Sequence, residues 1–378
     1  IDNNPLVGGK TDINFLKKLS QKGVDVLVCD STNVFNQKSS GSEGDVRKSL
    51  LKIIKNSPSN RIYVTTFASN VARLSSLIHI AEKLKIKICV MGGSLQRALE
   101  IARNCGYINK ISNLVNVSEI PRNEKTIILC TGCQGEPRAA LSRIAFDHHQ
   151  LKFNGDDLVI FSSKIIPGNE KKISSIINKI TRLGVEVITE KDQFVHVSGH
   201  PGREELLFLY NLLKPYSVIP VHGEARHIKE HTKFAKESGI KTSLEVNNGD
   251  VVNLSSKVIF IESTVPSGKL LVDGNQLILP ESEVIKHRYR IKDNGIIFIN
   301  IIKYEGKKSP RKILISSAGV INDETELENM LLDDISKSYK LGLVNKKNEE
   351  LIIRQSTNRV LKKITDKKPK VIIKIFID

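Results

Sequence analysis

The chain has 378 residues, of which 40% are hydrophobic and 26% are charged, and its formal net charge is +17. This composition is typical of a globular protein with two or three domains, and it excludes a disordered or fibrous chain. The positive charge favours a polyanionic partner, although a lysine-rich surface without such a partner would give the same value. No apolar run is long enough to cross a membrane. The five cysteines form an odd and scattered set, which indicates a reducing cytoplasm.

The first elements predicted are a helix over 12–22 and a strand over 24–29, whose continuous apolar run is typical of a buried strand. The strand ends at Asp30, which is followed by Ser-Thr-Asn. A carboxylate at the tip of a buried strand is costly unless it is paired or binds cations, so Asp30 is a candidate metal ligand. The alternative is a turn or a helix cap, since these residue types also favour turns. Gly-Ser-Glu at 41–43 is typical of a helix start, and a helix is predicted over 46–55.

Strands and helices alternate regularly between residues 60 and 190. This alternation predicts a parallel sheet with helices on both faces. Glycine- and serine-rich loops follow the strands and would present backbone N–H groups at helix N-termini, an arrangement that suits phosphate but is common in α/β proteins. Their candidate contacts are Ser69, Asn70 and Ser94. The predicted strands are 62–66, 87–92, 126–131 and 157–162, and the predicted helices are 70–84, 94–104, 139–146 and 169–183.

Two histidines follow predicted strands in the next segment. Alternation over 194–198 predicts a strand that leads to His200, and the strand predicted over 217–221 leads to His222. With a helix between them over 204–213, the two histidines are expected at the same edge of one sheet, where α/β proteins build sites.

The helix predicted over 225–238 carries His227 and His231 on one face. With no third ligand nearby, we expect that face to be solvated. An Asn-Gly turn then predicts a strand pair over 243–246 and 251–254.

A linker near 262–270 precedes a small α/β domain. Its predicted strands are 296–303, 312–317 and 370–377, and its predicted helices are 323–341 and 349–364.

Eight sequence blocks, in family order, resemble the ribonuclease J family, which consists of β-CASP nucleases with a metallo-β-lactamase fold. They are CDSTN (29–33), GSEGDV (41–46), FASNVAR (67–73), TGCQGEPRAALSRIA (131–145), FSSKIIPGNE (161–170), HVSGHPGREEL (196–206), PVHGEARH (220–227) and VDGN (272–275).

The resemblance implies an α/β fold: the C-terminal part of a metallo-β-lactamase αββα sandwich, interrupted by a β-CASP parallel α/β domain and followed by a small C-terminal α/β domain. The expected boundaries are 1–58 and 193–256 for the partial metallo-β-lactamase domain, 59–192 for the β-CASP domain, 257–274 for a linker and 275–378 for the last domain.

The resemblance also implies a metal-dependent RNA phosphodiester hydrolase, acting as a 5′–3′ exoribonuclease, an endoribonuclease or both in RNA processing and decay. Asp30 matches the family residue that bridges two metal ions, and His222 matches a terminal ligand. Zn²⁺ is the expected ion and Mn²⁺ the alternative. His200 and Ser198 match the motif at the scissile phosphate, where His200 would protonate the leaving oxygen.

Further roles are implied for residues around this site. His196 is expected to support His200 from within the sheet. Contacts to RNA phosphate are expected from His196, Ser69, Asn70 and Ser94. Glu43 and Glu224 are expected to support the metal ligands. Gly93 departs from the family, which often carries arginine there, and this places the 5′-monophosphate pocket in doubt.

The signature His-x-His-x-Asp-His cluster of the family is absent from residues 1–378. We therefore expect the chain to be part of a longer enzyme and to lack two-metal catalysis by itself. The alternative is a non-catalytic RNA-binding or assembly subunit of the same family. In either case the C-terminal domain is expected to support a homo-oligomer, a dimer or a tetramer.

Overall fold

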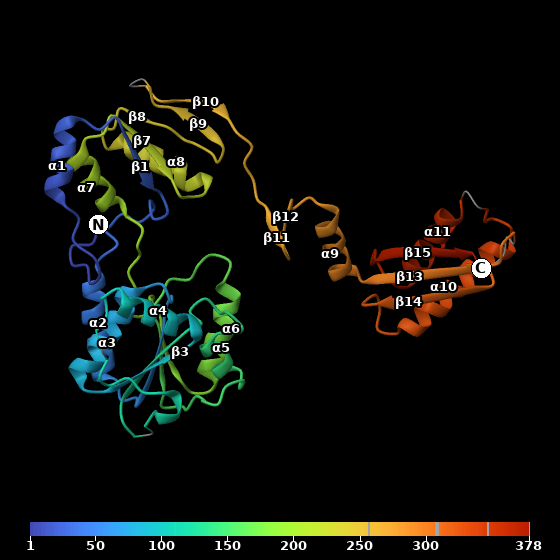
Figure 1. The fold of residues 1–378 in the computed structure, drawn as a ribbon, viewed down its shortest axis with the longest axis horizontal. Coiled ribbons are helices and arrows are strands. Elements are labelled where there is room, and N and C mark those ends of the chain that lie inside the picture. The colour runs from blue at the N-terminus through green and yellow to red at the C-terminus, as the bar shows by residue number, and fades with distance from the viewer. Residues whose placement is uncertain (110, 122, 256–257, 307–309, 346–347, 378) are drawn as a thin grey trace. The chain divides into compact units, whose positions relative to one another are not determined.

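The computed structural model describes residues 1–109, 111–121, 123–255, 258–306, 310–345 and 348–377. It divides into two compact units, Ile1–Val265 and Pro266–Asp378, whose elements are labelled in Figure 1. Residues 256, 257 and 378, which end or begin expected domains, lie outside the described ranges. Among the described helices, none has the length and apolar character needed to span a membrane.

The larger sheet of the first unit has five parallel strands in the order β3-β4-β2-β5-β6, which confirms the predicted parallel sheet. Successive strand residues face opposite sides, so Ile62 and Val64 lie in one core and Tyr63 in the other. Helices α2, α3 and α4 cover the first face, and α5 and α6 cover the second (Figure 1). The elements are α2 (Glu43–Asn56), β2 (Arg61–Thr65), α3 (Val71–Leu84), β3 (Lys87–Met91), α4 (Gly93–Asn104), the 3₁₀ turn η1 (Val117–Glu119), β4 (Thr126–Cys130), α5 (Ala140–Ala145), β5 (Leu158–Phe161), α6 (Glu170–Arg182) and β6 (Glu186–Ile188).

The smaller sheet of this unit has three parallel strands in the order β1-β7-β8. Asp30 at the end of β1 lies opposite Val221 at the end of β7, so the carboxylate and the residue after Val221 meet at one sheet edge. Cys29, Tyr210 and Val218 belong to the core between this sheet and its helices. The elements are α1 (Ile13–Lys22), β1 (Val26–Asp30), α7 (Arg203–Leu213), β7 (Ser217–Val221), α8 (Ala225–Glu237) and β8 (Thr242–Ser243).

Three predictions for this region are wrong. The strand predicted to be fully buried at 24–29 buries only Cys29 of β1, and Val28 on the opposite face is 59% exposed. Residues 194–198 form no strand. The hairpin predicted between 243–246 and 251–254 does not form, because β8 pairs with β7, while β9 (Asp250–Asn253) pairs with β10 (Phe260–Thr264).

The second unit contains a two-stranded hairpin, a helix and a three-stranded sheet covered by two helices. Strand β13 is central, antiparallel to β14 and parallel to β15, and its Ile297, Ile299 and Ile301 are fully buried. The predicted small α/β domain is present in all its predicted elements, whereas β11, β12 and α9 were not predicted. The elements are β11 (Leu271–Asp273), β12 (Gln276–Ile278), α9 (Glu283–Asn294), β13 (Ile296–Lys303), β14 (Lys312–Ala318), α10 (Glu324–Lys340), α11 (Glu349–Ile364) and β15 (Lys370–Ile377).

Arg73 on α3 is hydrogen-bonded to three other segments of the first unit: the start of α2, the end of β5 and the segment over 194–198. Its side chain is fully buried and donates hydrogen bonds to both carboxylate oxygens of Glu43, at 3.0 to 3.2 Å. It also donates to the carbonyl groups of Ser162 at 2.9 Å and Val195 at 2.8 Å. A buried charge persists only where it is paired and hydrogen-bonded, and Arg73 meets both conditions. The irregular segment over 194–198 is therefore held by a side chain rather than by a neighbouring strand.

We expect Arg73→Met to lower the free energy of unfolding of the first unit by about 3–5 kcal/mol, because the partly buried carboxylate of Glu43 and two carbonyl groups would each lose a charged donor. Urea unfolding of the chain measures this change. The control is Arg97→Ala, since Arg97 is exposed on α4, and it should stay within about 0.5 kcal/mol of the unsubstituted chain. Equal stabilities for the two variants would contradict the role given to Arg73.

Candidate metal centre

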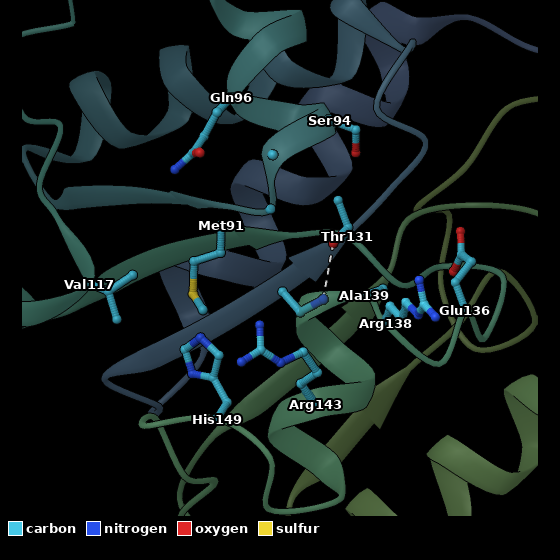
Figure 2. A pocket seen from close by; sticks show the side chains of 13 residues that line it. Met91, Ser94, Gln96, Val117, Thr131, Glu136, Arg138, Ala139, Arg143 and His149 are labelled. Atoms are coloured by element: carbon cyan, nitrogen blue, oxygen red, sulfur yellow. Dashed lines mark hydrogen bonds between the residues drawn. The ribbon is translucent and has the colours of Figure 1, made fainter.

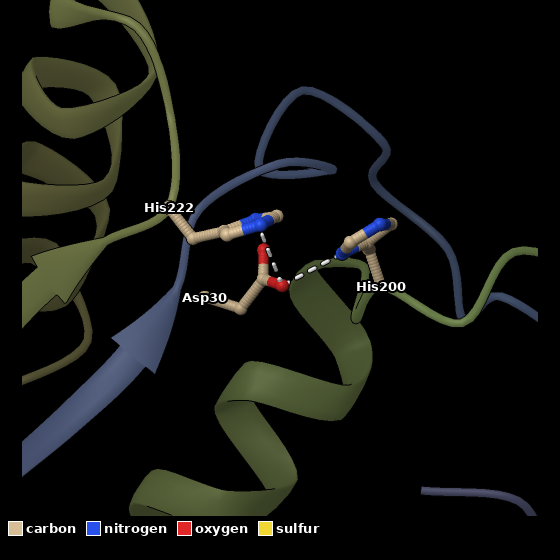
Figure 3. A group of neighbouring side chains, drawn as sticks. All are labelled: Asp30, His200 and His222. Atoms are coloured by element: carbon tan, nitrogen blue, oxygen red, sulfur yellow. Dashed lines mark hydrogen bonds and ion pairs between the residues drawn. The ribbon is translucent and has the colours of Figure 1, made fainter. Parts of the chain in front are cut away.

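Asp30, His200 and His222 lie together at the carboxyl end of β1 (Figure 3). The Asp30 carboxylate oxygen Oδ2 lies 2.7 Å from His200 Nδ1 and 3.5 Å from His222 Nδ1. The two imidazole rings stack, with centroids 5.2 Å apart and planes inclined by 21°. One donor atom from each residue lies within 4.8 Å of the other two. The three side chains are 29%, 40% and 64% exposed, so the group is open to a ligand from solvent.

The hydrogen bonds around Asp30 keep its carboxyl group ionised. Burial opposes ionisation, but hydrogen bonds from His200 and Thr32 outweigh it and lower the pKa of Asp30 below its usual value. The Thr32 backbone N–H donates to Asp30 Oδ1 at 2.7 Å. At neutral pH Asp30 is therefore a carboxylate, the form that binds cations.

Thr32 fixes the ring of His222. Its hydroxyl donates to the His222 carbonyl at 2.9 Å, so the hydroxyl oxygen is left to accept from His222 Nδ1–H at 2.8 Å. In this tautomer Nε2 carries the free lone pair. His222 has a φ of 58°, a left-handed conformation that is uncommon outside glycine and recurs at functional sites. Gly223 follows. A side chain there would displace its neighbours, because its Cβ would lie 2.7 Å from the Cβ of His227.

These residues fit a divalent metal ion in their chemistry. Imidazole nitrogen and carboxylate oxygen, which His222 and Asp30 supply, are ligands that zinc accepts. An ionised carboxylate has lone pairs beyond those used by His200 and Thr32, so Asp30 can bind a cation without losing these hydrogen bonds.

The segment that carries His200 is held by Asn33, the last residue of the turn after β1. Asn33 Nδ2 donates to Ser198 Oγ and to the His200 carbonyl, both at 2.9 Å. These two bonds tie the positions of Ser198 and His200 to the turn after β1.

His196 is placed differently from expectation. It lies in no sheet, and among the described residues its buried Nδ1 has no hydrogen-bond partner. Burial, together with the nearby charges of Arg73 and Lys164, lowers the pKa of His196 to about 4. The prediction that His196 supports His200 from within a sheet is wrong, because the strand over 194–198 does not form.

Glu43, Asn70 and Glu224 are engaged away from the three donors. Glu43 accepts from Arg73 and, at 3.3 Å, from Asn70 Nδ2. Asn70 also caps α3 by accepting the Arg73 backbone N–H at 2.9 Å. Glu224 is the N-cap of α8 and is 76% exposed. Asn70 and Glu224 thus cap helices, and Glu43 pairs with the buried guanidinium of Arg73.

Ser94 lies in the first turn of α4 and lines a cavity of about 450 Å³ (Figure 2). Figure 2 shows Arg143 and His149 side by side, on the other side of the cavity from Ser94. Arg138 lines the same cavity, and no side chain caps the N-terminus of α4. Two guanidinium groups and a helix N-terminus together suit an anion. Ser69 is exposed after β2 and lies outside this lining.

Sequence reasoning missed the cavity residues Arg138, Arg143 and His149. The available signal was Arg138, just after the glycine-rich loop 132–136, with Arg143 in the helix that follows. Burial and the neighbouring charge of Arg143 lower the pKa of His149, so at neutral pH the fixed positive charge of the cavity comes from the two arginines.

His231 contradicts the prediction of a solvated helix face. It is fully buried, and its Nδ1 lies 2.8 Å from Ser31 Oγ and its Nε2 2.6 Å from Tyr210 Oη. His227, four residues earlier, is 16% exposed. The prediction failed because the partners of His231 come from positions 21 and 200 residues away in the chain.

Two family models match the chain. Residues 59–180 match the model described as "Ribonuclease J, beta-CASP domain", and residues 184–244 match the model described as "Zn-dependent metallo-hydrolase RNA specificity domain". The first match covers the five-stranded sheet except for β6, and the second includes the loops that carry His200 and His222.

Several curated proteins are similar to the chain over most of its length. Ribonuclease J of Sinorhizobium meliloti is 32% identical over 388 residues, which cover 100% of this chain and 68% of that protein. Ribonuclease J2 of Bacillus subtilis is 34% identical over 388 residues, 98% of this chain and 69% of that protein. Ribonuclease J of Corynebacterium glutamicum is 32% identical over 350 residues, 89% of this chain and 49% of that protein.

The chain thus spans between about half and just over two thirds of the length of these relatives. The agreement of the domain matches with the full-length similarities identifies the family: the chain belongs to the ribonuclease J family of metal-dependent nucleases.

Proposed function

We propose that the chain contributes Asp30, His200 and His222 to a metal-dependent site that hydrolyses RNA phosphodiester bonds, as a 5′–3′ exoribonuclease, an endoribonuclease or both. The observation that carries the proposal is the convergence of one carboxylate and two imidazoles within 4.8 Å. Zn²⁺ is the proposed ion because the donors include imidazole nitrogen, with Mn²⁺ as the alternative.

Asp30 and His222 would hold the metal, and His200 would act on the RNA. A bound metal would activate water and neutralise charge on the phosphate. His200 directs Nδ1 to the Asp30 carboxylate, which orients its ring. Its Nε2 is then available to give a proton to the leaving oxygen. Ser198, held by Asn33, would bind a phosphate oxygen beside it.

The cavity beside Ser94 is proposed to bind an RNA phosphate. Gly93 lacks the arginine side chain expected before this serine, and Arg143 faces the same cavity from the α5 side. Arg143 would therefore supply the missing positive charge, although it also donates to the His148 carbonyl at 3.2 Å. Ser69 and His196 are proposed as further contacts along the RNA.

The matched residues 59–180 and 184–244 support a β-CASP domain over 59–192 and a returning metallo-β-lactamase part over 193–256. Free cysteines, four of them buried, support a reducing compartment, which we propose to be the cytoplasm.

We also propose that the C-terminal unit forms a homo-oligomer. Val272 and Leu277 pair across the β11–β12 hairpin and are 78% and 66% exposed. Such adjacent exposed apolar side chains favour contact with another protein surface.

The metal assignment predicts different outcomes for the three donors. We expect His222→Ala and Asp30→Asn each to lower Zn²⁺ affinity more than about 100-fold, since losing only a hydrogen-bond partner of a ligand costs about 10–100-fold. His200→Ala should retain bound zinc with a loss of about tenfold, because it removes a hydrogen bond to Asp30 and no ligand. Isothermal titration calorimetry measures these affinities, and His79→Ala on the exposed surface of α3 is the control.

His200→Ala should also remove most RNA cleavage while zinc stays bound. This is measured on the native protein, purified from source cells whose gene carries the substitution. Equal losses of zinc affinity for His200→Ala and His222→Ala would show instead that His200 is a ligand. Full zinc affinity in Asp30→Asn would reject the site.

The phosphate assignment is tested with Arg143→Ala. We expect weaker binding of 5′-phosphorylated RNA, and a plot of log affinity against log salt concentration whose slope is reduced by about 1, because one phosphate contact is lost. Fluorescence anisotropy at several salt concentrations measures both. Arg182→Ala removes the same charge from the last turn of α6 and should leave the slope unchanged. An equal effect of the two variants would mean that Arg143 acts only through net charge.

The oligomer assignment is tested by sedimentation velocity. We expect the unsubstituted chain to sediment as a dimer or tetramer, and Val272→Lys with Leu277→Lys to sediment as a monomer, because two charges would have to be buried in the contact. Leu254→Lys, at a site 56% exposed in the first unit, is the control. A double variant that stays oligomeric would place the contact elsewhere.

A further inference from the structure

Three polar side chains are buried behind the metal donors. Ser31 and His231 are fully buried and Tyr210 is 2% exposed, within a core that contains Cys29 and Val218. Buried polar groups cost free energy unless they are hydrogen-bonded. Both ring nitrogens of His231 are used, Nδ1 with Ser31 Oγ at 2.8 Å and Nε2 with Tyr210 Oη at 2.6 Å. The three groups therefore form one continuous hydrogen-bonded chain, from α7 through α8 to the end of β1.

This chain ends between two residues that hold the site. Ser31 lies between Asp30 and Thr32 in the chain. The Thr32 hydroxyl is hydrogen-bonded to both the ring and the carbonyl of His222. The Ser31 backbone N–H donates to the carbonyl of Val221, the residue before His222, at 2.8 Å. A movement of Ser31 would therefore displace the carboxylate on one side and the imidazole on the other.

Close packing leaves the turn little room to adjust. A Cβ built on Gly223 would lie 3.2 Å from the Cβ of Ser31, so the loop after His222 rests directly on Ser31. Tyr63 offers a contrast in the other sheet: it is fully buried, yet its Oη has no hydrogen-bond partner among the described residues. Tyr63 is therefore a matched site, at which removing a buried tyrosine hydroxyl breaks no hydrogen bond among the described residues.

We propose that Tyr210, His231 and Ser31 are positioning residues, whose buried chain fixes the turn over 30–32 and thereby sets the placement of Asp30 and the tautomer of His222. The inference rests on the proposed function for its consequence, metal binding. The tautomer of His222 can be measured in the chain without added metal.

The test uses Tyr210→Phe, which removes one oxygen atom from the chain of hydrogen bonds, and His231→Leu, which removes its centre. Tyr63→Phe is the matched control. The first measurement is the tautomer of His222 in the metal-free protein, read from long-range ¹H–¹⁵N NMR correlations of the imidazole rings. The second is Zn²⁺ affinity by calorimetry, and the third is the thermal unfolding midpoint.

We expect His222 to be the Nδ1–H tautomer in the unsubstituted chain and a mixture in Tyr210→Phe and His231→Leu, with Zn²⁺ affinity reduced about tenfold. Tyr63→Phe should change neither reading. His231→Gln, which keeps a donor and an acceptor, should restore part of the affinity lost in His231→Leu. Should His231→Leu fail to fold, the His222 tautomer and the Zn²⁺ affinity of Tyr210→Phe test the proposal.

Variants with a lower unfolding midpoint but an unchanged tautomer and zinc affinity would overturn the proposal, because the buried chain would then serve stability alone. If the unsubstituted chain binds no zinc, the proposed metal site fails, while the tautomer of His222 still decides whether the buried chain positions it.

Discussion

The candidate site depends on one four-residue turn, Asp30 to Asn33, at the end of β1. Its side chains bond to three other parts of the first unit. Asp30 and Asn33 bond to the segment of Ser198 and His200, Ser31 bonds to His231, and Thr32 bonds to the His222 ring. Segments nearly 200 residues apart in the chain thus meet at one point. Because the turn follows a strand paired in register with β7, its position is set by the sheet. The positions of the donors are consequently fixed by the fold, and such preorganisation favours tight binding.

A second constraint links this turn to the five-stranded sheet. Arg73 holds Glu43 of α2 and the carbonyl of Val195, only five residues before His200. Asn33 holds the same segment at its other end. The His200 loop is therefore fixed from both sides by side chains, although it belongs to no strand. Residues that contact neither metal nor RNA consequently decide where the proposed proton donor lies.

The sequence predicted most elements of the five-stranded sheet and of the C-terminal three-stranded sheet, and the meeting of Asp30, His200 and His222, because regular periodicity and strand ends carry that information locally. It failed where the outcome depended on partners distant in the chain. Alternation over 194–198 is compatible with a strand, but this segment pairs with no strand in the part of the chain that the structure describes, and Arg73 donates to the Val195 carbonyl. His231 sits at a polar-looking helix position, and only the fold reveals that Tyr210 faces it.

The central claim, that nitrogen and oxygen donors of this chain hold a metal, is tested most directly by X-ray absorption spectroscopy of Zn²⁺ bound to residues 1–378. The account predicts a coordination shell of nitrogen and oxygen only, with the multiple-scattering signature of imidazole. Burial and the neighbouring Asp30 raise the pKa of Cys29 to about 12, so its thiol keeps its proton and stays out of the shell. Sulfur in the coordination shell, or zinc without imidazole, would contradict the account.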